Sequence, residues 1–257
     1  MKDVLIYTVH KAASMFLHQL AAEISKIYKI DYYSINQKEN FDEIKGTSWL
    51  SYMTSENRHG CFGPIRAGEA EPNIPENLEK YSVIVHLRDP RDVLVSLFYS
   101  HIYSHPSAGG FNVDQSTKKQ WEKSGVDKFV LERAPTFLNY YNKLYSELIV
   151  NEHVVFIKYE AMVLEYGVWL KSFLSAFEHF EIPNKSLFWR FSGYKSHNDI
   201  YDSLYKKHVG DFVATTENVS KHKRQITPGD YKRKLASATI DELNEVLGDV
   251  LLKLKYF

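Results

Sequence analysis

Apolar and polar positions follow two patterns along the chain, one typical of buried strands and the other of helices. Short apolar runs rich in β-forming residues occupy residues 4–9, 82–87 and 154–158, as expected for buried strands of a parallel sheet. After each run, apolar residues recur every three or four positions, which predicts an amphipathic helix. The chain is therefore expected to repeat a strand–turn–helix unit.

The same patterns predict the remaining elements. The segments expected to be helical, wholly or largely, are 15–28, 91–103, 115–150, 160–179 and 239–255. Asp89 followed by Pro90 is typical of a helix N-cap and first helical position. Residues 30–35 are a candidate further strand. Gly, Pro and Asn recur through residues 36–80, which predicts an irregular insertion, and residues 183–235 are expected to mix loop and helix.

These elements predict an α/β fold: one domain over residues 1–257 with three layers, a mostly parallel central sheet flanked by helices, as in P-loop NTPases. Ligands of such sheets bind beyond the carboxyl ends of the strands. Three polar segments are expected to gather there, at residues 10–14, 88–91 and 159–160.

Composition narrows the function classes. Apolar residues make up 44% and charged residues 25% of the 257 residues, as in soluble globular proteins. The formal net charge is zero, so no global field attracts nucleic acid. No apolar stretch approaches the roughly 20 residues of a membrane span. Cys61 is the single cysteine, which excludes an intramolecular disulfide and fits a reducing, cytoplasmic location. No cluster of metal ligands stands out.

The first candidate motif is TVHKAASMFL, residues 8–17, at the junction of the first strand and helix. Backbone N–H groups at a helix N-terminus attract an anion, Lys11 adds a charge, and Ser14 a hydroxyl. Ala12 and Ala13 are small enough for a phosphate to approach the backbone. The Walker pattern GxxxxGK[ST] is absent, which disfavours ATP or GTP hydrolysis. An ordinary turn with a surface lysine is the alternative.

Three further motifs follow. In VIVHLRDPRDVLVSLFYS, residues 83–100, Arg88 and Ser96 are eight positions apart, so both can face one phosphate. The alternative to phosphate binding is an ion pair with a neighbouring aspartate, and this alternative suits Arg91 better than Arg88. IKYEAM, residues 157–162, places Tyr159 at a strand end, and KHKRQITPGDYKRKL, residues 221–235, is a basic loop with a Pro-Gly turn.

The four motifs together resemble those of the sulfotransferases that use 3′-phosphoadenosine-5′-phosphosulfate (PAPS). TVHKAASMFL is similar to their 5′-phosphosulfate loop, usually PKSGTTW, and RDPRDVLVSLFYS to their 3′-phosphate motif, RNPKDVAVSYYH. KYEAM is similar to their YEDM-type segment and KRQITPGDYKRKL to their RKGxxGDW loop. The motifs occur in the family's order over residues 8–235. The loop departs from the usual form in having Ala-Ala for Ser-Gly and Met15 for a threonine.

The resemblance implies a role for each matching residue. Lys11 would hold the 5′-phosphosulfate and stabilise the leaving phosphate, and Phe16 would stack on adenine. Arg88 and Ser96 would bind the 3′-phosphate, and Tyr159 would contact the nucleotide. The remaining donor-binding residues implied are the loop residues Ala12, Ala13, Ser14 and Met15, together with Arg224 and Gln225 of the basic loop.

The implied reaction is in-line sulfonate transfer from PAPS, leaving 3′-phosphoadenosine-5′-phosphate (PAP), with no metal. A general base should take the acceptor's proton. The position at which cytosolic members of the family carry this base as a histidine holds Arg66, and His59 is the nearest histidine upstream. ENFDEI, residues 39–44, resembles the segment that carries a glutamate base in glycosaminoglycan-type members, which makes Glu43 the other candidate.

Acceptors compatible with this chemistry are hydroxyls or amines of small molecules, lipids or carbohydrates, and the sequence determines neither the acceptor nor the oligomeric state. Two alternatives remain open. One is a P-loop-type nucleotide kinase, which shares the strand–turn–helix anion site. The other is a non-catalytic member of the fold that binds PAP or PAPS without turnover.

Overall fold

The computed structural model describes residues 2–34, 52, 58–67, 74–104, 114–183, 194, 196–212 and 226–257. The chain forms two compact units. Unit 1 comprises Met1–Leu87 and Tyr145–Phe212, and unit 2 comprises Arg88–Leu144 and Val213–Phe257. Each unit is described by itself below. The expectation of one domain over residues 1–257 stays a prediction.

Unit 1 contains a five-stranded parallel sheet of order β2-β3-β1-β4-β5. Its strands are β1 (Asp3–Val9), β2 (Tyr32–Tyr33), β3 (Cys61–Ala67), β4 (Tyr81–Leu87) and β5 (Val154–Lys158). The prediction of a mostly parallel central sheet flanked by helices is confirmed. The three apolar runs of the sequence are β1, β4 and β5, and each pairs with its neighbour in parallel register.

Strand β3 corrects the prediction of an irregular insertion over residues 36–80. It lies between β2 and β1, but its sequence CFGPIRA contains Gly63 and Pro64, two residues that disfavour strands. The pairing of β1 with β3 is irregular at this point, between Leu5 and Tyr7. The candidate strand over residues 30–35 is reduced to the two residues of β2.

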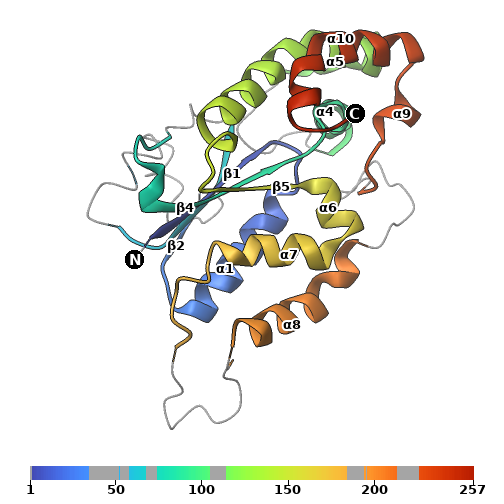
Figure 1. Ribbon diagram of the computed structural model, residues 1–257. Coiled ribbons are helices and arrows are strands. Elements are labelled where there is room, and N and C mark those ends of the chain that lie inside the picture. The colour runs from blue at the N-terminus through green and yellow to red at the C-terminus, as the bar shows by residue number, and fades with distance from the viewer. Residues whose placement is uncertain are drawn as a thin grey trace. The chain divides into compact units, whose positions relative to one another are not determined.

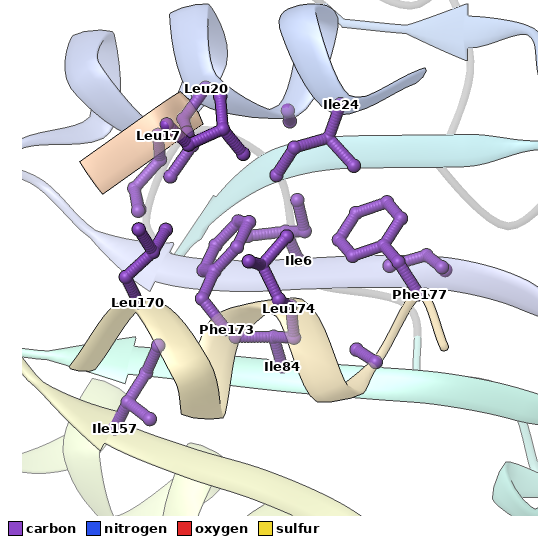
Figure 2. Close-up of a cluster of buried hydrophobic side chains, with 14 of the residues drawn as sticks. Ile6, Leu17, Leu20, Ile24, Ile84, Ile157, Leu170, Phe173, Leu174 and Phe177 are labelled. Atoms are coloured by element: carbon purple, nitrogen blue, oxygen red, sulfur yellow. The ribbon is translucent and has the colours of Figure 1, made fainter. Parts of the chain in front are cut away.

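Helices α1 (Ser14–Tyr28), α7 (Tyr166–Ser175) and α8 (His197–His208) pack with the sheet around the core of unit 1. Figure 1 shows α1 and α7 side by side along the sheet, and Figure 2 shows their apolar side chains directed at Ile6 and Ile84 of the strands. The predicted helix over 160–179 is two helices, α6 (Tyr159–Leu164) and α7, which part at Glu165. Short helical turns lie at Leu78–Lys80, Tyr145–Ile149 and Val209–Phe212.

Unit 2 is helical in its described residues. It contains α4 (Pro90–Tyr99), a π-helical turn (Ser100–Ser104), α5 (Gln115–Leu144), α9 (Tyr231–Lys234) and α10 (Ser237–Lys253). The predicted cap is confirmed, because the Asp89 side chain accepts the backbone N–H of Arg91 at 2.9 Å and Pro90 is the first helical residue. Helix α5 is interrupted at Gly125, whose φ is 82°. No described helix has an apolar stretch long enough to cross a bilayer.

Candidate donor-binding site

The turn between β1 and α1 in unit 1 has the backbone of an anion-binding nest. Lys11 and Ala13 adopt left-handed conformations with φ of 64° and 58°, whereas Ala12 between them does not. Successive backbone N–H groups in a turn of this kind can converge on an anion. Left-handed backbone is strained for residues other than glycine, and such strain concentrates at functional sites.

The start of α1 strengthens this anion site. No side chain caps the helix, and no acidic residue lies in its first turn. The first N–H groups of a helix have no partner within it, and the helix dipole places partial positive charge at the same point. Ser14, the first helical residue, is buried, and the Lys11 side chain is partly exposed. The described turn therefore presents donors and a cation, with no carboxylate in the first helical turn to repel an anion.

Phe16 follows the turn but faces the core of unit 1. Its ring meets that of Phe212 edge-on at 4.8 Å and that of His208 at 5.5 Å, and it is 6% exposed. Met15 beside it is exposed. Adenine stacking on Phe16, implied by the resemblance, stays a prediction.

His86 of β4 lies behind the turn and is fully buried. Its ring centroid is 5.6 Å from that of Trp169 and 6.4 Å from that of Tyr159. Burial lowers the pKa of His86 to about 3, and the contact with the Ala12 backbone opposes this only in part. His86 is therefore a neutral imidazole packed beneath the turn. Sequence reasoning gave it no role, because a histidine inside an apolar run carries no signal of what it will contact.

Tyr159 is the first residue of α6, directly after β5, as the motif IKYEAM predicts. It is 4% exposed and lies in the same buried cluster as His86 and Trp169. The structure thus brings Tyr159 close to the residue that supports the Lys11 turn, all within unit 1.

Arg88, the first residue of unit 2, is part of a buried network. Its guanidinium lies 3.5 Å from the Asp92 carboxylate, and the two side chains are 4% and 0% exposed. The Tyr141 hydroxyl donates a hydrogen bond to the Arg88 carbonyl. Asp92 also accepts the backbone N–H of Gly229 at 2.8 Å and that of Tyr231 at 2.9 Å. Arg88 and the described part of the basic loop, at Gly229 and Tyr231, are therefore joined through one carboxylate.

Arg91 is held by groups of its own unit. It donates to the Asp89 carboxylate at 2.7 Å, to the Asn244 amide oxygen at 2.7 Å and to the Tyr256 carbonyl at 3.0 Å. Its guanidinium stacks over the Tyr231 ring at 4.3 Å. Burial raises the pKa of Asp89, although the ion pair with Arg91 opposes the shift. The expectation that an aspartate pairs with Arg91 is confirmed, whereas the view that such pairing suits Arg88 less is corrected, because Arg88 pairs with Asp92.

Of the other candidate residues, the structure describes Ser96 and His59. Ser96 lies in α4 and is partly buried. His59 precedes β3 and is 3.4 Å from Asp3, the first residue of β1, with its side chain 78% exposed. The amino ends of two parallel strands lie at one edge of the sheet, and their carboxyl ends lie at the opposite edge. Lys11 follows the carboxyl end of β1, whereas His59 precedes the amino end of β3. The structure therefore does not bring His59 to the Lys11 turn. Glu43, Arg224 and Gln225 lie outside the described residues.

One comparison with known proteins shows the family of the chain. A family model described as the sulfotransferase domain matches residues 1–255. The sequence matches no curated protein. Among solved structures, mouse sulfotransferase SULT7A1 complexed with PAP has a TM-score of 0.56 at 14% identity, covering 97% of this chain and 84% of its own. Retinol dehydratase in complex with androsterone and inactive cofactor PAP has a TM-score of 0.48 at 12% identity, covering 98% and 81%.

Proposed function

The chain belongs to the sulfotransferase family, and we propose that it transfers the sulfonate of PAPS to a hydroxyl or amine of a small-molecule, lipid or carbohydrate acceptor. The observation that carries the proposal is the turn between β1 and α1. There Lys11, left-handed backbone and an uncapped helix N-terminus coincide. This combination suits the doubly negative phosphosulfate end of the donor.

The donor would be held by residues of the four motifs. Lys11 and the backbone of residues 12–15 would bind the 5′-phosphosulfate, with Phe16 and Tyr159 toward the nucleoside. Arg88, Ser96, Arg224 and Gln225 would bind the 3′-phosphate. Support for this donor comes from the four motifs in family order and from the PAP bound to the mouse relative. Arg88 suits its role because a guanidinium fork matches phosphate oxygens.

The chemistry would be an in-line displacement. The acceptor oxygen or nitrogen attacks sulfur, the bond from sulfur to the phosphate oxygen breaks, and the acceptor's proton passes to a base. Lys11 would neutralise the charge that develops on the departing phosphate of PAP. Such stabilisation aimed at a developing charge contributes about 10²–10³-fold in rate at comparable sites. The residues proposed for this reaction need no metal.

The location proposed for this activity is the cytoplasm. It is supported by the single cysteine, Cys61, which is buried in β3. Burial raises the pKa of its thiol to about 12, so the thiol stays protonated and unreactive at neutral pH.

Calorimetry with PAP and 5′-AMP tests the donor. The two nucleotides differ in the 3′-phosphate alone, so we expect the wild type to bind PAP more tightly. Arg88→Lys keeps a positive charge beside Asp92 but loses the forked guanidinium. It should weaken the binding of PAP by about 10–100-fold and leave the affinity for 5′-AMP unchanged. Arg133→Ala, a substitution of a guanidinium stacked on Trp121, is the control.

Each alternative function gives a distinct result. Preference for ATP over PAP would favour a nucleotide kinase. Tight PAP binding without sulfonate transfer to any phenol, alcohol, amine or glycan in an acceptor panel would favour a non-catalytic member of the fold. Absence of PAP binding by the folded wild type would overturn the proposal.

A further inference from the structure

A hydrogen-bonded relay in unit 1 fixes the tautomer of His18. The Nδ1 atom of His18 lies 2.8 Å from the Tyr32 hydroxyl, which donates to the Gly63 carbonyl at 2.8 Å. Tyr32 has a single hydroxyl proton, and a carbonyl can only accept. Because that proton goes to Gly63, His18 must donate from Nδ1. The tautomer follows from this count of donors and acceptors: Nε2 carries the lone pair.

His18 lies one turn along the helix that follows the Lys11 turn. It is the fifth residue of α1, so a rise of 1.5 Å per residue puts it about 6 Å along the helix from Ser14. A spacing of four residues also places the two side chains on one face of the helix. Strand β3, which carries Gly63, ends beside β1, with Arg66 paired to Thr8 and Ala67 to Val9. His18 therefore lies one helical turn from the start of α1, and Gly63, its partner through Tyr32, is level with the middle of β1.

The surroundings of His18 keep its ring neutral. The side chain is about half buried, and burial lowers its pKa from the ordinary 6.5. The positive charge of Arg66 on β3 lowers the pKa further. Tyr32, whose pKa is raised chiefly by burial, remains a neutral hydroxyl. A histidine that is unprotonated at neutral pH, with one nitrogen held by a relay, meets the requirements of a general base.

We propose that His18 is the general base of the sulfonate transfer, with Nε2 as the accepting atom. This inference rests on the proposed function. As the acceptor oxygen or nitrogen bonds to sulfur, its proton moves to Nε2, and the electron pair of the breaking sulfur–oxygen bond leaves with the phosphate of PAP. The imidazolium then releases its proton to solvent. Tyr32 is a positioning residue that orients the ring.

The relay itself is tested first, by measuring the ¹⁵N chemical shifts of the His18 ring in the folded protein. We expect protonated Nδ1 and unprotonated Nε2 above the His18 pKa. His18→Asn identifies the signals by their loss. Protonation at Nε2 instead would overturn the proposal, because that nitrogen could not accept a proton.

Kinetics with the best acceptor of the panel test the catalytic role. His18→Asn retains a donor in place of Nδ1–H but removes Nε2, and should lower kcat by about 10²-fold or more. Tyr32→Phe should give a smaller loss. In the wild type kcat should fall as pH drops below the ordinary histidine pKa, and this acid limb should disappear in His18→Asn. Unchanged kcat in His18→Asn would overturn the proposal.

Three further variants complete the design. His179→Asn changes an exposed histidine bonded to the Lys2 carbonyl and should leave kcat unchanged. Loss of turnover in His59→Asn or Glu43→Gln, with His18→Asn active, would assign the base elsewhere. PAP affinity separates the two proposals. If wild type and His18→Asn bind PAP equally, the donor assignment stands whatever the kinetics give, whereas a wild type that binds no PAP contradicts the proposed function itself.

Discussion

The Asp92 carboxylate accepts the backbone N–H of Tyr231 at 2.9 Å, joining residues 139 positions apart in the chain. The same carboxylate accepts the N–H of Gly229 and lies beside the Arg88 guanidinium. The Asp92 side chain is fully buried, so its charge depends on these three partners. Asp92 therefore joins the described part of the basic loop to the residue proposed to bind the 3′-phosphate.

Asp92→Asn should destabilise the protein by about 3 kcal/mol, because it removes the carboxylate charge beside the buried Arg88 guanidinium and the amide cannot accept both N–H groups as the carboxylate does. Unfolding in urea measures the change in free energy. Asp249→Asn, an exposed aspartate of α10 beside Lys253, is the matched control and should change stability by less than about 0.5 kcal/mol. Similar values for both variants would contradict the role given to Asp92.

Ala13→Gly should stabilise the protein by about 1 kcal/mol. Ala13 is left-handed with φ of 58°, a conformation that glycine adopts without strain, and glycine is also a better N-cap than alanine. Ala12→Gly is the control, since Ala12 lacks the positive φ and should lose stability on replacement. Thermal unfolding distinguishes the two, and a lower melting temperature for Ala13→Gly would mean that the turn is unstrained.

His86 should make the protein less stable as pH falls. Its folded pKa is about 3, well below the ordinary 6.5, so between these values the unfolded chain binds a proton that the folded chain does not. Stability therefore rises with pH across this window, by at most ~1.4 kcal/mol per pH unit from this one group. Urea unfolding at pH 6.5 and 4.5 measures the free energy of unfolding at each pH. The difference between the two values should be smaller for His86→Gln than for the wild type. An equal difference would exclude a buried neutral His86.

Lys11→Ala should reduce sulfonate transfer by at least about 10²-fold, because the variant lacks the cation proposed to stabilise the departing phosphate. Binding of PAP should weaken less than turnover, since the backbone N–H groups of the turn remain. Lys26→Ala removes an exposed lysine near the other end of α1 and should leave the rate unchanged. Transfer rates with labelled PAPS test both variants, and full activity of Lys11→Ala would remove Lys11 from the mechanism.

Prediction succeeded where the signal is local. Strands β1 and β4 are short apolar runs, because a parallel strand buried on both faces requires apolar side chains at nearly every position. Strand β5 was found from the same kind of run, although it lies at the sheet edge and is only partly buried. The helix N-cap formed by Asp89 and Pro90 depends on adjacent residues, so the sequence predicted it as well. Strand β3 was missed because Gly63 and Pro64 weaken its own propensity, and its place between β2 and β1 comes from its partners.

By itself, the sequence determined the strands β1, β4 and β5, the helices that follow them and the chemistry available at the ends of these strands, since all are recorded in neighbouring residues. Tertiary structure decided the left-handed backbone at Lys11 and Ala13, the burial of His86 beneath that turn, and the relay from His18 to Gly63. Backbone N–H groups and carbonyls are the partners in these features, and they occur at almost every residue. No residue type marks which of them will be used, so the assembled fold alone reveals the choice.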